Sequence, residues 1–128
     1  MTSSQLPSTA TTSTTPGDAA VVRVTGEIDM FTSDDLLHRC ATALDGGAAC
    51  LVVDLAEVTF FASSGIAALG RLREHNATPR RPVHVVASRA VRRSLELTAM
   101  DRLLPLHDTV DEALAAARFE AHLDGATG

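Results

Sequence analysis

The sequence predicts a single α/β domain built on a mixed, partly parallel β-sheet with about four helices. Apolar runs of strand length alternate with segments whose apolar residues recur at helical spacing, and the connections between them are short. A chain of 128 residues suits one domain that buries its own core without disulfides or metal. Hydrophobic residues make up 45% of the chain and charged residues 21%, which is ordinary for a globular protein, so the prediction rests on the alternation itself.

The beginning of the chain differs in composition from the rest. Ten of the sixteen residues in Thr2–Gly17 are Ser or Thr, and none is charged. So polar a segment buries too little surface to offset its chain entropy, and it lacks the basic start and apolar centre of a secretory signal. We therefore expect a disordered tail over residues 1–17, a domain over 18–120 and a short C-terminal tail over 121–128.

The first part of the domain predicts a strand, a helix and a second strand. Ala19–Thr25 is a short apolar run of β type, and either Thr32 or Ser33 is placed to cap the helix that follows. The apolar face of that helix comprises Leu36, Leu37, Cys40, Ala41 and Leu44. A Gly-Gly pair ends the helix, and Ala49–Leu55 then has the near-continuous apolar run of a strand covered on both faces.

The middle of the domain predicts another helix, a third strand and a third helix. Ser63–Gly65 begins the first of these helices, and Asn76 and Pro79 end it. Val83–Ala87 is an apolar run that predicts the strand, and Ser88 is placed to cap the next helix. The apolar face of this third helix comprises Val91, Leu95, Leu97 and Met100.

The last part of the domain predicts a weak strand and a final helix. Leu103–Leu106 contains a proline, which places this strand at an edge of the sheet. Thr109 is followed three residues later by Glu112, the pattern of a capping box at the start of a helix. The apolar residues of that helix are Leu114, Ala117 and Phe119. Right-handed crossovers then place the helices against the sheet.

Two short segments carry the functional argument. Thr-Gly-Glu-Ile-Asp at 25–29 follows the first strand, and Asp-Leu-Ala-Glu-Val-Thr-Phe-Phe-Ala-Ser-Ser-Gly-Ile at 54–66 runs from the second strand into the second helix. Together with Ala-Ser-Arg-Ala-Val-Arg-Arg at 87–93, they resemble the STAS-domain anti-sigma factor antagonists of bacteria, the anti-anti-sigma factors. The family patterns are Leu-Thr-Gly-Glu-Leu-Asp and Asp-Leu-x-x-Val-x-Phe-x-Asp-Ser-Ser-Gly-Leu. The resemblance extends over about residues 18–120, close to the whole domain.

The resemblance implies a binding protein, not an enzyme. In this family the unphosphorylated antagonist binds an anti-sigma factor that is also a serine kinase, and the sigma factor is released. The kinase then phosphorylates a serine of the antagonist with ATP, the complex dissociates, and a phosphatase resets the system. The acceptor is the first Ser of Ser-Ser-Gly, which falls on Ser63 in this chain. The implied partners are an anti-sigma factor serine kinase and a phosphatase in the cytoplasm, and no cofactor is implied for this chain.

The residue chemistry around Ser63 agrees with such a switch. A helix N-terminus offers free N–H groups and a partial positive charge, so a phosphate is tolerated there. The phosphate adds about −1.5 to −2 units of charge, and a hundredfold loss of affinity requires only about 2.7 kcal/mol. On residue type alone, Ser-Ser-Gly fits an ordinary helix start better than an acceptor site, because Ser is a leading N-cap residue.

The chain departs from the family pattern directly before the acceptor, where Ala62 replaces the usual Asp. The change removes a carboxylate and a helix cap, which bears on phosphorylation more than on binding. We expect the partner-binding surface to comprise Gly26, Glu27, Asp29, Ala62, Ser63, Ser64 and Gly65. Gly26 and Asp29 also fit a plain turn, with Gly26 supplying the backbone freedom and Asp29 capping its neighbours.

Other residue clusters favour neither nucleic-acid binding nor metal binding. The net charge is −5 and the chain has neither Trp nor Tyr, which argues against a nucleic-acid or anionic membrane surface. Seven arginines lie close together in the sequence: Arg71, Arg73, Arg80, Arg81, Arg89, Arg92 and Arg93. We interpret them first as the solvated faces of two helices and a loop, and second as a surface for an acidic protein. The five histidines match no zinc spacing, and His84 is expected to be half-buried in its strand. Cys40 and Cys50 are expected to be reduced, packed thiols.

Two functional classes other than an antagonist are a hydrolase and a constitutive adaptor. A hydrolase with Ser63 as nucleophile lacks the Gly-x-Ser-x-Gly pattern, and the chain has no Gly-rich phosphate loop. No apolar run approaches the roughly 18 residues of a membrane span, so membrane insertion is not expected. A constitutive STAS adaptor or scaffold subunit, for example of a transporter, is the main alternative, and Ala62 slightly favours it.

Overall fold

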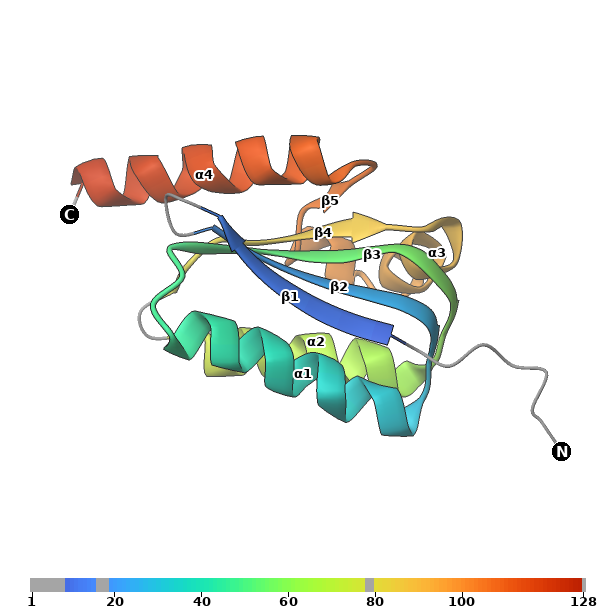
Figure 1. The fold of residues 1–128 in the computed structure, drawn as a ribbon. Coiled ribbons are helices and arrows are strands. Elements are labelled where there is room, and N and C mark those ends of the chain that lie inside the picture. The colour runs from blue at the N-terminus through green and yellow to red at the C-terminus, as the bar shows by residue number, and fades with distance from the viewer. Residues whose placement is uncertain (1–8, 16–18, 78–79, 128) are drawn as a thin grey trace, which may run out of the picture.

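The computed structural model of the chain describes residues 9–15, 19–77 and 80–127. Its strands form one five-stranded sheet in the order β1-β2-β3-β4-β5 (Figure 1). The strands are β1 (Thr9–Thr15), β2 (Ala19–Ile28), β3 (Cys50–Phe61), β4 (Val83–Ala87) and β5 (Leu106–His107). β1 is antiparallel to β2, and the other neighbouring pairs are parallel, so the predicted mixed sheet is confirmed.

The helices cover the two faces of the sheet unequally. They are α1 (Met30–Asp45), α2 (Ser63–His75), α3 (Arg89–Leu97), the short 3₁₀ helix η1 (Met100–Arg102) and α4 (Val110–Thr127). The strands β2 to β5 lie side by side in the sheet in the same order as in the chain. Right-handed crossovers between them therefore place α1, α2 and α3 on one face. α4 follows the last strand and lies on the opposite face (Figure 1). The predicted α/β class with about four helices is thus confirmed.

Alternate residues of the strands face two separate cores. The larger core, against α1, α2 and α3, contains Val22 and Val53, whereas the smaller core, against α4, contains Val21 and Val52. Because both faces of β3 are covered, its first six residues are all buried. Each fully buried aliphatic side chain contributes about 1.5–3 kcal/mol relative to exposure, which is why these central strands specify the fold.

The predicted disordered tail is wrong for residues 9–15. This segment forms β1 and pairs with β2 in the register Thr9↔Thr25 to Thr15↔Ala19, and Ala10 packs against the larger core. Threonine is β-branched and favours extended backbone, and an edge strand needs only one hydrogen-bonded neighbour. Composition alone therefore failed to predict that this segment forms a strand. Residues 1–8 and 16–17 of the predicted tail lie outside the described residues.

Several predicted boundaries also shift. α1 begins at Met30, because Asp29, and not Thr32 or Ser33, is its N-cap. The segment expected to be a C-terminal tail, 121–128, continues α4 as far as Thr127. The edge strand is Leu106–His107, which begins after the proline that cannot donate a ladder hydrogen bond.

Two apolar residues assigned to cores are exposed. Leu97 lies two positions beyond the buried Leu95 of α3, and Phe119 lies two positions beyond the buried Ala117 of α4. Two residues correspond to about 200° around a helix, so both side chains point away from the sheet. Val91, Leu95 and Ala117 are buried as predicted.

The predicted caps and thiols agree with the structure. Ser88 accepts a hydrogen bond from the N–H of Val91 at 3.3 Å, and Thr109 accepts one from the N–H of Glu112 at 3.2 Å. Cys40 and Cys50 are free and buried, and burial raises the pKa of the Cys40 thiol to about 12. Asn76 is the C-cap of α2, while Pro79, also predicted to end it, lies outside the described residues. Across the described ranges, no helix combines the length and apolarity needed to cross a bilayer.

A chain of polar contacts joins α4 to the sheet. His84 of β4 is buried, not half-buried as predicted, with its Nε2 2.9 Å from Oε1 of Glu120. Its Nδ1 lies 2.8 Å from Nε2 of His107 in β5, and the two rings stack with centroids 5.0 Å apart. Burial, and secondarily the neighbouring His84, hold the pKa of His107 below its usual value.

We expect this arrangement to make the fold acid-sensitive. Because the pKa of His107 is lowered in the folded state, the unfolded chain binds the proton more readily, and stability declines as the pH falls below about 6.5. Urea unfolding between about pH 7.5 and pH 5 should show a smaller decline for His107→Gln than for wild type. His122→Gln, on an exposed position of α4, is the control. An unchanged acid dependence in His107→Gln would contradict this assignment.

Candidate partner-binding site at the start of helix α2

The end of β3 leads directly into the predicted acceptor. Ala62 is the N-cap of α2, with extended backbone (φ −76°, ψ 169°), and the N–H of Gly65 donates to its carbonyl at 2.9 Å. The methyl side chain of Ala62 makes no capping hydrogen bond. Ser63 is the first residue of the helix and its side chain is exposed. The structure therefore places Ser63 at an N-terminus that no side chain caps, where backbone N–H groups attract an anion.

The two adjacent serines have different surroundings. Ser64 is partly buried, and its Oγ is fully covered without a hydrogen-bond partner among the described residues. A group that must reach a protein kinase has to be accessible, so the geometry favours Ser63 and disfavours Ser64 as an acceptor. Ser64 contributes to the packing of the helix start.

Gly65 is required by packing. A Cβ at this position would lie 2.7 Å from Cε1 and 2.8 Å from Cζ of Phe61, whose ring is buried in the larger core. Glycine thus lets the first turn of α2 close over the Phe61 ring, which gives the third residue of Ser-Ser-Gly a structural reason.

The loop between β2 and α1 lies beside this helix start. In the parallel register Glu27 is opposite Phe60 and Ile28 is opposite Phe61. The N–H of Ala62 donates to the carbonyl of Ile28 at 3.0 Å. The structure therefore brings together the two segments that the sequence singled out, Gly26–Asp29 and Ala62–Gly65.

Gly26 and Asp29 have clear structural roles in this loop. Gly26 has a φ of 91°, which favours glycine, and its carbonyl accepts a hydrogen bond from Thr59 Oγ1 at 3.3 Å. Asp29 Oδ1 accepts from the N–H groups of Phe31 at 2.9 Å and Thr32 at 3.1 Å, and its own N–H donates to Thr32 Oγ1 at 2.8 Å. These backbone hydrogen bonds lower the pKa of Asp29, and the bond from Thr32 has the largest effect. Both residues therefore shape the surface, whatever they contact in a partner.

Three exposed apolar side chains next to these loops were missed in the sequence. Met30 is 66% exposed and Phe31 80% exposed at the start of α1, and Phe60 is 52% exposed on β3 beside Glu27. We call these three residues the apolar rim. Exposed large apolar side chains near a loop are a feature of protein interaction sites. The available signal was that Phe31 lies two residues after the first motif and Phe60 lies within the second.

The chemistry of the site suits docking of a protein. It combines an accessible hydroxyl, an uncapped helix N-terminus and the apolar rim. Over the ranges that the structure describes, no group of three or more His, Cys, Asp or Glu side chains could hold a metal ion. Such a surface buries apolar area against a partner and places one modifiable hydroxyl at its edge.

Comparisons with known proteins agree with the geometry. The family model described as the STAS domain matches residues 10–113. Anti-sigma-F factor antagonist RsfB of Mycobacterium tuberculosis is 28% identical over 99 residues, which cover 77% of this chain and 81% of RsfB. A crystal structure of an anti-sigma factor antagonist from Mycobacterium paratuberculosis superposes with a TM-score of 0.75 at 32% identity, covering 88% of this chain and 95% of that one.

The same fold occurs outside antagonists. A sulfate transporter family protein from Wolinella succinogenes superposes with a TM-score of 0.71. That match covers 84% of this chain and 90% of the other at 16% identity, so it is a likeness of fold alone.

The uncapped start of α2 leads to a stability prediction. Ala62→Asp introduces a carboxylate that accepts hydrogen bonds from the first N–H groups of α2, and the free energy of unfolding should rise by about 1 kcal/mol. Ala62→Ser should give a similar increase without the charge, and Ala56→Asp, an exposed position within β3, serves as the control for the added charge. Urea unfolding measures all three. If neither cap variant is more stable than wild type, the first N–H groups of α2 already have hydrogen-bond partners and the prediction is wrong.

Proposed function

The chain belongs to the STAS domain family and is homologous to anti-sigma factor antagonists, and from this premise we propose that it binds an anti-sigma factor through the surface around Ser63. Phosphorylation of Ser63 switches this binding off. The observation that carries the proposal is the exposed Ser63 at the uncapped start of α2, beside the 26–29 loop. RsfB and the Mycobacterium paratuberculosis protein, both named as anti-sigma factor antagonists, support the assignment of the partner class.

In the unphosphorylated state the apolar rim supplies the binding energy. Burial of aromatic side chains dominates most protein interfaces, and a few such residues carry most of the affinity. Phe31 is the most exposed residue of the apolar rim, and its N–H donates to the side chain of the Asp29 cap, which fixes its backbone at the start of α1. The anti-sigma factor, held by this chain, is then unable to hold its sigma factor.

In the phosphorylated state the same surface carries a new charge. The phosphate adds about −1.5 to −2 units of charge, which the partner would have to desolvate in the interface. The N–H groups at the start of α2 stabilise the phosphate where it forms. Because Ser63 is exposed, the domain does not need to refold, and only affinity changes.

The partners perform the chemistry of the switch. In the forward step the Ser63 Oγ attacks the γ-phosphorus of ATP bound to the anti-sigma factor kinase, and ADP leaves. The hydroxyl proton passes to a base of the kinase, because this chain places no histidine beside Ser63 among its described residues. A phosphatase hydrolyses the phosphoserine and restores the binding state. We place this cycle in the cytoplasm, where sigma factors act.

A second candidate function is a constitutive STAS adaptor or scaffold subunit. Ala62 favours it, because the position before the acceptor lacks the carboxylate of the family pattern and leaves the helix uncapped. The likeness of fold to a transporter family protein is compatible with such a role. An adaptor would use the same apolar rim but would not respond to the state of Ser63.

Co-purification with charge variants distinguishes the two functions. We expect an anti-sigma factor kinase to accompany wild type and Ser63→Ala but to be lost, with affinity reduced about a hundredfold, from Ser63→Asp. Ala115→Asp adds the same charge at an exposed position of α4 on the opposite face and should keep the partner. Incubation with the kinase and ATP should label wild type and Ser64→Ala but not Ser63→Ala. A partner retained equally by all variants would instead identify the adaptor.

The apolar rim provides an independent test of the binding surface. Phe31→Ser should weaken binding of the anti-sigma factor by about tenfold or more, because it removes an aromatic anchor. Phe119→Ser is the matched control, since Phe119 is 65% exposed but lies on α4. Both variants should keep the wild-type unfolding midpoint. Equal binding by both variants, measured by titration calorimetry, would move the interface away from the apolar rim.

A further inference from the structure

Two adjoining hollows near the C-terminal end of α2 have no part in the site around Ser63. Each has a volume of about 470 Å³, and both are lined by Arg73, Arg80 and Leu103. They share these residues as lining and together make up one surface region between α2 and the segment that follows η1. We call it the α2–η1 groove and define it by Ala67, Gly70, Arg71, Arg73, Arg80 and Leu103.

The groove is rich in positive charge. No carboxylate forms an ion pair with Arg71, Arg73 or Arg80 among the described residues, whereas Arg23, Arg39 and Arg92 each have such a partner. The carboxylates that line the hollows are Glu74 and Glu120, and Glu120 is already bound to His84. Three guanidinium groups without a carboxylate partner, gathered along one lining, favour an acidic ligand.

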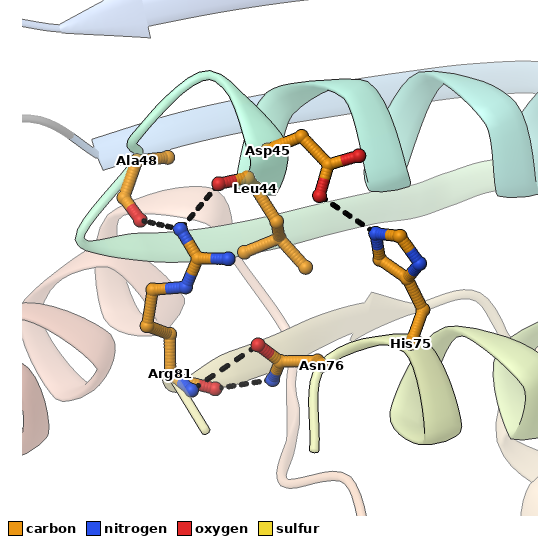
Figure 2. A network of polar contacts seen from close by, with 6 residues as sticks. All are labelled: Leu44, Asp45, Ala48, His75, Asn76 and Arg81. Atoms are coloured by element: carbon orange, nitrogen blue, oxygen red, sulfur yellow. Dashed lines mark hydrogen bonds and ion pairs between the residues drawn. The ribbon is translucent and has the colours of Figure 1, made fainter. Parts of the chain in front are cut away.

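Polar contacts fix Arg81 at the edge of the groove (Figure 2). The side chain of Asn76 donates to the carbonyl of Arg81 at 2.7 Å and accepts from its N–H at 3.2 Å. The Arg81 guanidinium turns toward α1, where its Nη1 donates to the carbonyls of Leu44 and of Ala48, the latter at 3.1 Å. Arg81 is therefore committed to the fold. The neighbouring Arg80 is exposed at the edge of the groove.

The shape of the groove admits an apolar side chain. Ala67 and Gly70 line it from α2 and Ala77 from just beyond the helix, and a Cβ added at Gly70 would meet no atom within 4 Å. Leu103 lines the opposite side and is 48% exposed. The groove thus offers a shallow apolar floor between arginines, which fits a ligand with both carboxylates and apolar groups.

We propose that the α2–η1 groove is a second docking surface, and that it binds an acidic amphipathic segment of a partner protein. Carboxylates of the segment pair with Arg71, Arg73 and Arg80, and its apolar side chains pack against Leu103 and over Gly70. A nucleic acid fits less well, because it would bring a dense row of phosphates against an acidic chain. Ser63 and Arg73 are ten residues apart on α2, or about 15 Å along the helix axis.

The first test uses a charge series. The probe is a fluorescein-labelled helical peptide with Leu at i, i+3, i+4 and i+7 spacing and Glu on the other face, and its analogue with Lys for Glu is the control. Fluorescence anisotropy should show binding of the acidic peptide alone, and the doubly substituted Arg73→Glu/Arg80→Glu should lose about tenfold or more in affinity. Arg89→Glu/Arg93→Glu, on α3, is the matched control and should bind as wild type. Equal binding by both double variants, or no binding by wild type, would overturn the proposal.

The second test changes the shape of the groove without changing its charge. Gly70→Leu places a side chain in the open space of the groove, whereas Gly70→Ala adds a methyl group that meets nothing, and both favour the helix over Gly. We expect Gly70→Leu to lose the acidic peptide and Gly70→Ala to keep it. Peptide binding that survives in Gly70→Leu would contradict docking in the groove.

Two further arms identify the class of ligand and separate this proposal from the switch. Duplex DNA and inorganic phosphate should neither bind nor displace the peptide at about 0.15 M salt, and displacement by either would overturn the assignment to a protein segment. Ser63→Asp should bind the peptide as wild type. If phosphorylation of Ser63 proves not to control binding of the anti-sigma factor, peptide binding in the groove should be unchanged. The two proposals are therefore tested separately.

Discussion

The candidate site depends on the parallel pairing of β2 with β3 at the ends of both strands. Parallel strands end at the same edge of a sheet, so the helices that follow them, α1 and α2, begin side by side. The hydrogen bond from the N–H of Ala62 to the carbonyl of Ile28 extends this pairing to the last residue before α2. Without it, the 26–29 loop, the apolar rim and Ser63 would be three unrelated surface features.

The same strand end decides which hydroxyl is available. The Phe61 ring occupies the space beneath the first turn of α2, so only glycine fits at position 65 and the turn lies close to the sheet. In that position the Ser64 hydroxyl is covered and the Ser63 side chain faces solvent. Two chemically identical residues thus acquire different roles through packing alone, and a buried hydroxyl without a partner is the cost of that arrangement.

α2 joins the two proposed surfaces at its opposite ends. Its N-terminus is positive through its free N–H groups, which suits a phosphate on Ser63. Its C-terminal turn carries Arg73, which suits the negative end of the helix dipole and supplies charge to the α2–η1 groove. Because the helix between them packs through Leu69 and Leu72 into the larger core, each end is a rigid platform. The two proposals together assign the response to a kinase to one end of α2 and the binding of an acidic segment to the other.

The sequence by itself determined the strand and helix order, the helix start at Ser63 and the loop at Asp29, because caps, glycines and apolar periodicity act over a few residues. Tertiary structure decided the rest. Thr9–Thr15 became a strand only because β2 offers an unpaired edge, which composition does not report. The exposure of Phe31 and the burial of the Ser64 hydroxyl depend on which face of a helix start meets the sheet. That orientation is set by contacts between segments far apart in the chain, and so local patterns could not reveal it.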